Sequence, residues 1–152
     1  MAKQKVAEEF RDATPEELAG KRPGDLDDLY LRRSKKRETL ETLKQHARDL
    51  RREMERQGLA VRKVWLEQRS ASKAHVRRLK LEGAMDAVIA GEVKTLAVWK
   101  TDRFDRRGMA AIGSALDEFD RRRARLYVLQ ENLDSSQQGT RIVFASHRHA
   151  RN

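Results

Sequence analysis

The sequence predicts an α/β domain with a mostly parallel central β-sheet and helices packed on it. Short apolar runs, typical of buried strands, alternate along the chain with stretches whose apolar residues recur every three or four positions, as in amphipathic helices. The composition agrees: 152 residues that are 38% hydrophobic and 38% charged suffice for one modest core under a heavily charged surface.

The elements follow from these patterns in order. Residues 1–25 hold both prolines and no sustained pattern, so we interpret them as a polar N-terminal arm outside the core, in which Thr14 and Pro15 can start a short helix. Beyond the arm, strands are predicted at 26–32, 61–65, 95–99 and 126–129, and helices at 39–57, 81–88 and 109–119. Gly58 and Gly91 stand where the first two helices are expected to end.

The charge balance favours a polyanionic partner. Lys and Arg number 34 against 24 Asp and Glu, a net charge of +10, which suits nucleic acid, although a merely soluble basic protein is the plainer alternative. The absence of cysteine excludes disulfides, thiolate nucleophiles and cysteine-bound metals. No signal peptide or membrane-length apolar run occurs, so we expect a soluble protein of the cytoplasm that does not enter membranes.

Three basic clusters lie at or after the ends of the first three predicted strands. They span residues 30–34, 69–73 and 100–106, and each places Arg or Lys beside Ser or Asp. Because ligands of parallel α/β sheets bind beyond the carboxyl ends of the strands, we expect the clusters to converge at one edge. A serine among several arginines suits phosphoryl transfer without a metal, and the DNA backbone is the indicated substrate.

Each cluster also has a plainer interpretation. Ser34 is a candidate nucleophile with Arg32 beside it on an extended strand, but the plainer interpretation is a loop serine next to a solvated arginine. Asp102 could cap a helix rather than orient an arginine. His147 and His149 lack the neighbours of a metal site, and no glycine-rich phosphate loop occurs, so we expect no metal and no cofactor.

Taken together, the motifs resemble the catalytic domain of the serine recombinase (resolvase/invertase) family, and most closely that of the large serine integrases of actinobacterial phages. The resemblance covers about residues 26–145. The residues that carry it are, in order, Tyr30, Arg32 and Ser34; then Glu67, Ser70, Ala71 and Arg78; then Gly91, Trp99, Lys100, Asp102, Arg103 and Arg106; and last Gly139.

The resemblance implies a reaction and roles for these residues. Ser34 would attack a DNA phosphodiester and form a 5′-phosphoserine link. Arg32, Arg78, Arg103 and Arg106 would bind the scissile phosphate, Asp102 would orient an arginine or assist the leaving oxygen, and Lys100 would assist at the phosphate. The remaining basic-cluster residues would bind DNA, namely Tyr30, Arg33, Ser70, Lys73 and Arg77. No metal or nucleotide would be needed.

The sequence departs from the family pattern at several positions. Glu38 and Leu43 stand where the family commonly has glutamines, with Gln45 as a possible stand-in, and Leu79 replaces a usual proline. We expect a catalytic domain at 26–145 and a polar tail at 146–152, a fragment truncated before the family's long helix and DNA-binding domains.

The expected partners are double-stranded DNA attachment sites and further copies of the chain, as a dimer or tetramer in the full-length context. Alone, the fragment is not expected to recombine DNA. The alternatives are a non-catalytic DNA-binding or regulatory fragment of a recombinase, and a phosphodiesterase that hydrolyses DNA without rejoining it.

Overall fold

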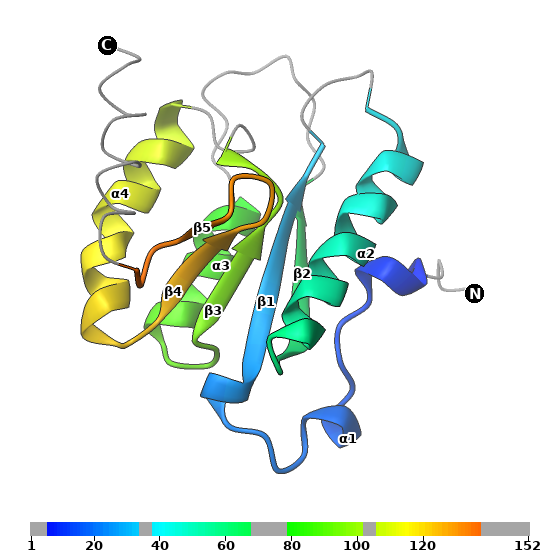
Figure 1. Ribbon diagram of the computed structural model, residues 1–152, viewed down its shortest axis with the longest axis horizontal. Helices are drawn as coiled ribbons and strands as arrows, with labels where there is room; N and C mark the ends of the chain where they lie inside the picture. The colour runs from blue at the N-terminus through cyan, green and yellow to red at the C-terminus, as the bar shows by residue number, and fades with distance from the viewer. Residues whose placement is uncertain (1–5, 34–37, 68–78, 102–105, 138–152) are drawn as a thin grey trace.

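A five-stranded sheet with helices on both faces forms the centre of the molecule (Figure 1). The computed structural model describes residues 6–33, 38–67, 79–101 and 106–137. The strands are β1 Leu26–Arg32, β2 Ala60–Glu67, β3 Thr95–Val98, β4 Arg125–Val128 and β5 Leu133–Asp134. The longer helices are α2 Leu40–Arg56, α3 Leu79–Ile89 and α4 Arg106–Arg121; α1 Pro15–Leu18 and the 3₁₀ helices η1 Glu8–Phe10 and η2 Pro23–Asp25 precede β1.

The sheet has the order β2-β1-β3-β4-β5, with β1 paired to β2 and β3. The first four strands run parallel, and β5 pairs antiparallel with β4. The predicted fold class, a mostly parallel sheet covered by helices, is therefore confirmed. The short strand β5 was not predicted from the sequence.

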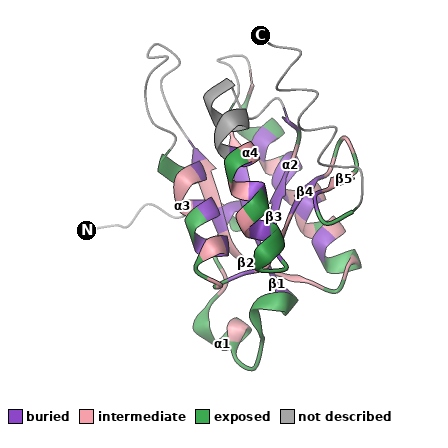
Figure 2. Cartoon of the chain, turned by 90° about the vertical axis from the view of Figure 1, so that its left-hand side faces the viewer, coloured by how far each residue is buried: buried purple, intermediate pink, exposed green. Residues whose placement is uncertain are grey.

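Helices cover the two faces of the sheet with separate apolar clusters. On one face, α2 packs its buried residues Leu43, Ala47, Leu50 and Met54 against the sheet. On the other, α3 and α4 pack around Tyr30 and the inward side chains of β3 and β4. Figure 2 shows the result: buried residues line the sheet and the inner sides of the helices, and exposed residues line their outer sides. None of the helices in the described ranges is long and apolar enough to cross a membrane.

Helix α2 begins and ends close to where the sequence predicted. The Thr39 side chain accepts a hydrogen bond from the Thr42 N–H at 3.1 Å, which satisfies one of the free donors of the first turn. Gly58 has a φ of 83°, a left-handed conformation that glycine adopts without steric cost after a helix. This local chemistry sets the direction in which the chain returns to β2.

The N-terminal segment packs more closely than predicted. Phe10 is only 8% exposed and belongs to the apolar cluster beneath α2, so the expectation of an arm outside the core is wrong at this residue. The segment also covers the outer edge of β2. The Ala13 N–H donates to the Arg62 carbonyl at 2.9 Å, and the Val64 N–H donates to Asp12 at 2.9 Å. A covered edge cannot template pairing with another chain there. The helix predicted at Thr14 and Pro15 is confirmed as α1.

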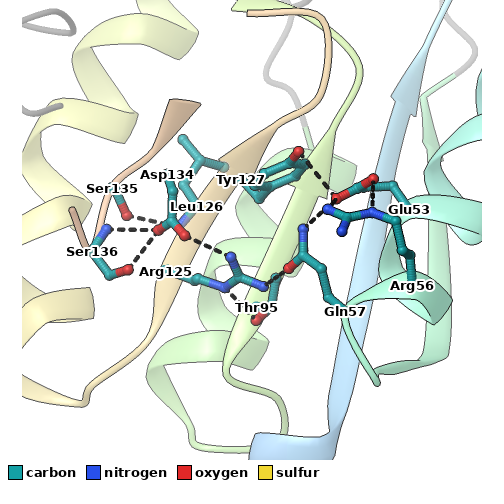
Figure 3. Close-up of polar contacts among 10 residues, drawn as sticks. All are labelled: Glu53, Arg56, Gln57, Thr95, Arg125, Leu126, Tyr127, Asp134, Ser135 and Ser136. Carbon is teal, nitrogen blue, oxygen red and sulfur yellow. Dashed lines mark hydrogen bonds and ion pairs between the residues drawn. The ribbon is translucent and has the colours of Figure 1, made fainter. Parts of the chain in front are cut away.

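Arg125, the first residue of β4, joins α2, β3 and β5 (Figure 3). Its guanidinium donates to Asp134 of β5 at 2.7 Å, to Thr95 of β3 at 3.2 Å, and to the Gln57 side chain after α2. Next to Arg125, Ser135 joins the end of β5 to β4. Its Oγ accepts from the Leu126 N–H at 2.8 Å, and its N–H donates to the Leu126 carbonyl. These contacts lock the β4–β5 hairpin onto the sheet.

Candidate active site

The carboxyl ends of the central strands meet at one edge of the sheet, as the sequence predicted. Arg32, the last residue of β1, pairs with Glu67, the last residue of β2. Val98, the last residue of β3, pairs with Tyr30. Ser34 follows β1 by two residues, so the chain enters the Ser34 segment from this edge. Three of the predicted site residues lie at or just beyond the ends of these strands, namely Arg32, Arg33 and Lys100.

Glu67 connects three elements beneath this edge. Its side chain is buried, and its Oε1 accepts from the Tyr30 hydroxyl at 3.3 Å and from the Leu81 N–H at 3.4 Å. The second bond satisfies a backbone donor of the first turn of α3, where a negative charge also meets the positive end of the helix dipole. Glu67 thus ties the ends of β1 and β2 to the start of α3, which follows Arg78 directly.

Tyr30 does not reach the surface. Its side chain is fully buried, and its hydroxyl donates to Glu67. A side chain in this position cannot touch DNA, so its expected role as a direct DNA contact is replaced by a structural one. The sequence pattern did not separate these roles, because an inward and an outward side chain alternate along any strand.

Arg32, Arg33 and Lys100 stand at the edge itself. Arg32 is half-buried, and Arg33 and Lys100 are exposed. The Arg33 Nε donates to the Glu38 carbonyl at 2.7 Å, and its N–H lies 3.5 Å from the Glu67 carbonyl. Cationic side chains at the ends of neighbouring parallel strands form a surface suited to an anionic ligand.

The chain leaving β3 is held by two residues that sequence reasoning missed. The His46 ring of α2 stacks on Trp99, with ring centroids 4.0 Å apart and an angle of 11° between the planes. Two residues after Trp99, the N–H and the hydroxyl of Thr101 both donate to Glu131, at 2.7 and 2.8 Å. The one available signal for Glu131 was its place just after the fourth parallel strand, at the same edge.

Seven predicted site residues lie outside the described residues: Ser34, Ser70, Lys73, Arg77, Arg78, Asp102 and Arg103. Arg106 begins α4, but its side chain is likewise not described. The structure does place the segments that flank them, namely the ends of β1, β2 and β3 and the starts of α3 and α4. The roles of these residues stay predictions.

Comparison with solved structures supports the same fold. The N-terminal catalytic domain of TP901-1 integrase superposes with a TM-score of 0.65 at 17% identity, covering 83% of this chain and 96% of that one. A resolvase family site-specific recombinase from Streptococcus pneumoniae gives 0.65 and 17%, with 83% and 87% covered. The C-terminal catalytic domain of ISC1926 TnpA, an IS607-like serine recombinase, gives 0.55 and 20%, with 68% and 69% covered.

At these identities the structural likeness shows the fold alone. No curated protein matches the chain. The family assignment comes from the sequence: the family model described as "Resolvase, N terminal domain" matches residues 29–149. That stretch begins within β1 and includes every later strand and helix in the described ranges, from α2 to β5. Because the match spans well over half of the chain, the chain belongs to the resolvase N-terminal domain family.

Proposed function

We propose that the chain is the catalytic domain of a site-specific serine recombinase in which Ser34 is the nucleophile. The observation that carries the proposal is the place of Ser34. It lies within the stretch that the family model matches, and in the sequence it comes two residues after the end of β1, near which Arg32, Arg33 and Lys100 stand. Ligands of parallel α/β sheets bind at this edge.

In the proposed reaction, the Ser34 Oγ attacks the phosphorus of a DNA phosphodiester. The Ser34 hydroxyl gives up its proton, the bond from phosphorus to the 3′ oxygen breaks, and the 3′ oxygen takes up a proton, so that a 5′-phosphoserine link and a free 3′-hydroxyl result. In the reverse step a 3′-hydroxyl attacks the phosphoserine and releases Ser34. Each step exchanges one phosphate ester for another, so rejoining needs no nucleotide, and we propose that it needs no metal.

Arginines would supply the charge that this chemistry requires. Phosphoryl transfer places negative charge on the phosphate oxygens in the transition state, and forked guanidinium groups stabilise it. We assign this role to Arg32, Arg78, Arg103 and Arg106, with Lys100 assisting at the phosphate and Asp102 orienting an arginine or assisting the leaving oxygen. Arg33, Ser70, Lys73 and Arg77 would hold the flanking DNA.

Tyr30 and Glu67 receive a supporting role in this proposal. Their buried hydrogen bond links the strand that leads to Ser34 with the strand that leads to Ser70, and Glu67 also holds the start of the helix that follows Arg78. They would therefore set the relative positions of the segments that carry the nucleophile and the arginines. The proposed partners are double-stranded DNA attachment sites and further copies of the chain, assembled as a dimer or tetramer.

Covalent trapping tests the proposal. The protein is incubated with a pool of random-sequence duplexes, denatured, and the DNA that stays attached is recovered and sequenced. We expect wild-type protein to retain DNA through its 5′ ends, and Ser34→Ala to retain none. Lys63→Ala serves as a matched control, because it removes a positive charge from β2 at a position that pairs with Asp28, four residues before the carboxyl end of the strand. The Lys63 Nζ lies over the Trp65 ring, and the variant is expected to retain DNA as the wild type does.

The net charge of +10 supports a second candidate, a non-catalytic DNA-binding module. This candidate predicts salt-sensitive binding of the same duplexes that is equal for wild type and Ser34→Ala, with no DNA attached after denaturation. That result would contradict the nucleophile assignment. Release of free 5′-phosphate ends without a protein link would instead favour hydrolysis.

A further inference from the structure

Glu131 lies in the turn between β4 and β5, at the same end of the sheet as the proposed site. Its carboxylate binds Thr101 through both oxygens: Oε1 accepts from the backbone N–H at 2.7 Å, and Oε2 accepts from the side-chain hydroxyl at 2.8 Å. Thr101 is 8% exposed, and Glu131 is half-buried. Two short bonds to a charged acceptor fix both the position and the rotation of the Thr101 residue.

The turn that carries Glu131 is itself held in place. Its N-terminal part continues the β3–β4 pairing, since the Leu129 and Gln130 N–H groups donate to the carbonyls of Val98 and Trp99 at 3.0 and 2.9 Å. The Asn132 N–H closes the turn on the Leu129 carbonyl at 3.1 Å. Asn132 has a φ of 50°, a left-handed conformation that asparagine tolerates better than most residues.

The hairpin lock around Arg125 and Ser135 secures the other side of the turn. Asp134 accepts from Arg125 at 2.7 Å, and Ser136 donates to Asp134 through its N–H at 2.9 Å and its hydroxyl at 2.6 Å (Figure 3). Glu131 therefore extends from a rigid support. A carboxylate on such a support can hold another segment in register rather than follow its movements.

The segment that Glu131 holds leads into the proposed chemistry. Thr101 directly precedes Asp102, and the stretch from Asp102 ends at Arg106, the first residue of α4. We propose that Glu131 is a positioning residue for cleavage. It fixes the entry to this stretch so that Asp102, Arg103 and Arg106 meet the scissile phosphate. The inference rests on the proposed function. A displacement of about 1 Å in such groups costs up to roughly 100-fold in rate.

A comparison of Glu131→Ala with Glu131→Gln tests the inference. The substrate is a duplex recovered by covalent trapping with wild-type protein, and the maximal rate of adduct formation and the half-saturating DNA concentration are measured separately. We expect Glu131→Ala to lower the maximal rate by about 10- to 100-fold, with half-saturation changed less than about twofold. Glu131→Gln keeps a carbonyl that can accept from the Thr101 N–H and an amide that can donate to its hydroxyl, so it is expected to recover most of the rate.

Thr101→Val separates the two bonds. It removes the hydroxyl but keeps the backbone N–H, and it is expected to cause a smaller loss than Glu131→Ala. Combined with Glu131→Ala it should add no further loss, because the contact is already gone. Gln130→Ala, an exposed side chain in the same turn, is the matched control and is expected to keep the wild-type rate.

The outcomes distinguish the inference from the function on which it rests. If the wild type forms no Ser34-dependent adduct, the proposed function fails. If the wild type forms the adduct and Glu131→Ala matches its rate, or loses DNA affinity and rate together, the positioning role is contradicted. A rate loss that Glu131→Gln does not recover, with the melting temperature unchanged, would also contradict a role through the Thr101 contact.

Discussion

Asp27, near the amino end of the inner strand β1, carries a carboxyl group that folding buries completely. Within the described part of the chain, neither of its oxygens has a hydrogen-bond partner. Burial, and next the neighbouring charge of Asp28, raise the pKa of Asp27 to about 7, while Arg51 and Arg125 partly offset them.

The raised pKa of Asp27 makes the free energy of unfolding depend on pH. Because the folded pKa lies above the unfolded one, the folded protein binds the proton more tightly, so the contribution of Asp27 to stability falls as the pH rises from about 4 to about 7. Asp27→Asn mimics the protonated group. We expect it to raise the free energy of unfolding by about 2 to 4 kcal/mol at pH 8 and by nearly nothing at pH 4.

Urea denaturation at the two pH values measures this difference. Asp86→Asn, an exposed carboxylate on α3, is the control and should show the same small change at both. An Asp27→Asn protein that gains no stability at pH 8 relative to pH 4 would show that the buried carboxyl is better solvated than its surroundings indicate.

At Gly83, we expect a substitution by alanine to change stability in the direction opposite to that of helix propensity. It lies in α3, and a Cβ at this position would come within 2.5 Å of the Trp65 ring. That ring is rigid and its Nε1 donates to Asp28 at 2.9 Å, so it cannot easily move aside. We expect Gly83→Ala to lower the free energy of unfolding by about 1 to 3 kcal/mol, although alanine favours helices over glycine. Thermal unfolding measures this difference, with Lys80→Ala at an exposed position of the same helix as the control. A melting temperature of Gly83→Ala above that of the wild type would refute the close contact.

At the scale of elements, Arg125 determines whether β5 stays attached to the sheet. Arg125 is the cation beside Asp134. Burial works to raise the pKa of Asp134, but the hydrogen bonds from Ser136 and Arg125 keep that pKa below its ordinary value. Both partners are largely buried, with side chains 19% and 13% exposed. Removing one partner of such a pair leaves an uncompensated charge in poorly solvated surroundings.

We therefore expect Arg125→Met to lower the free energy of unfolding by about 2 to 4 kcal/mol. Arg121→Met, which removes an exposed ion pair with Glu118, should cost less than about 1 kcal/mol. In a double-mutant cycle, Arg125→Met and Asp134→Asn should together cost less than the sum of the single changes. Strict additivity would mean that the pair is not coupled.

The elements show what sequence patterns can and cannot predict. The four parallel strands and three long helices were predictable because each has an apolar run or a sustained apolar period, and α2 also has local end signals at Thr39 and Gly58. β5 was missed because two residues, Leu133 and Asp134, are too few to show alternation. Phe10 was misjudged because an isolated aromatic residue has no periodic partners, and only the packing of α2 reveals its burial.

The site was predictable in outline for a different reason. The placement of basic clusters after successive strands follows from topology alone, so Arg32 and Lys100 could be assigned to one edge. The contacts of Glu131 with Thr101 and of His46 with Trp99 join positions far apart in sequence. Such contacts leave no local pattern, and neither does the inward orientation of Tyr30.

At the scale of the whole molecule, the two ends of the sheet have different tasks. The amino end holds the Arg125 contacts, which stabilise the fold. The carboxyl end presents the cations of β1 and β3 and the start of α3, supported from beneath by Glu67. This division allows loop segments to carry the proposed chemistry on a scaffold that is stabilised elsewhere.

The proposed function depends on a covalent link between Ser34 and DNA. Protease digestion of the trapped adduct, followed by mass spectrometry, identifies the modified residue directly. We expect one modified peptide, with a 5′-linked nucleotide phosphate on Ser34, and a complementary DNA fragment whose free 3′-hydroxyl a polymerase can extend. A nucleotide on any other residue, a 3′-phosphate link, or an adduct that forms equally in Ser34→Ala would contradict it.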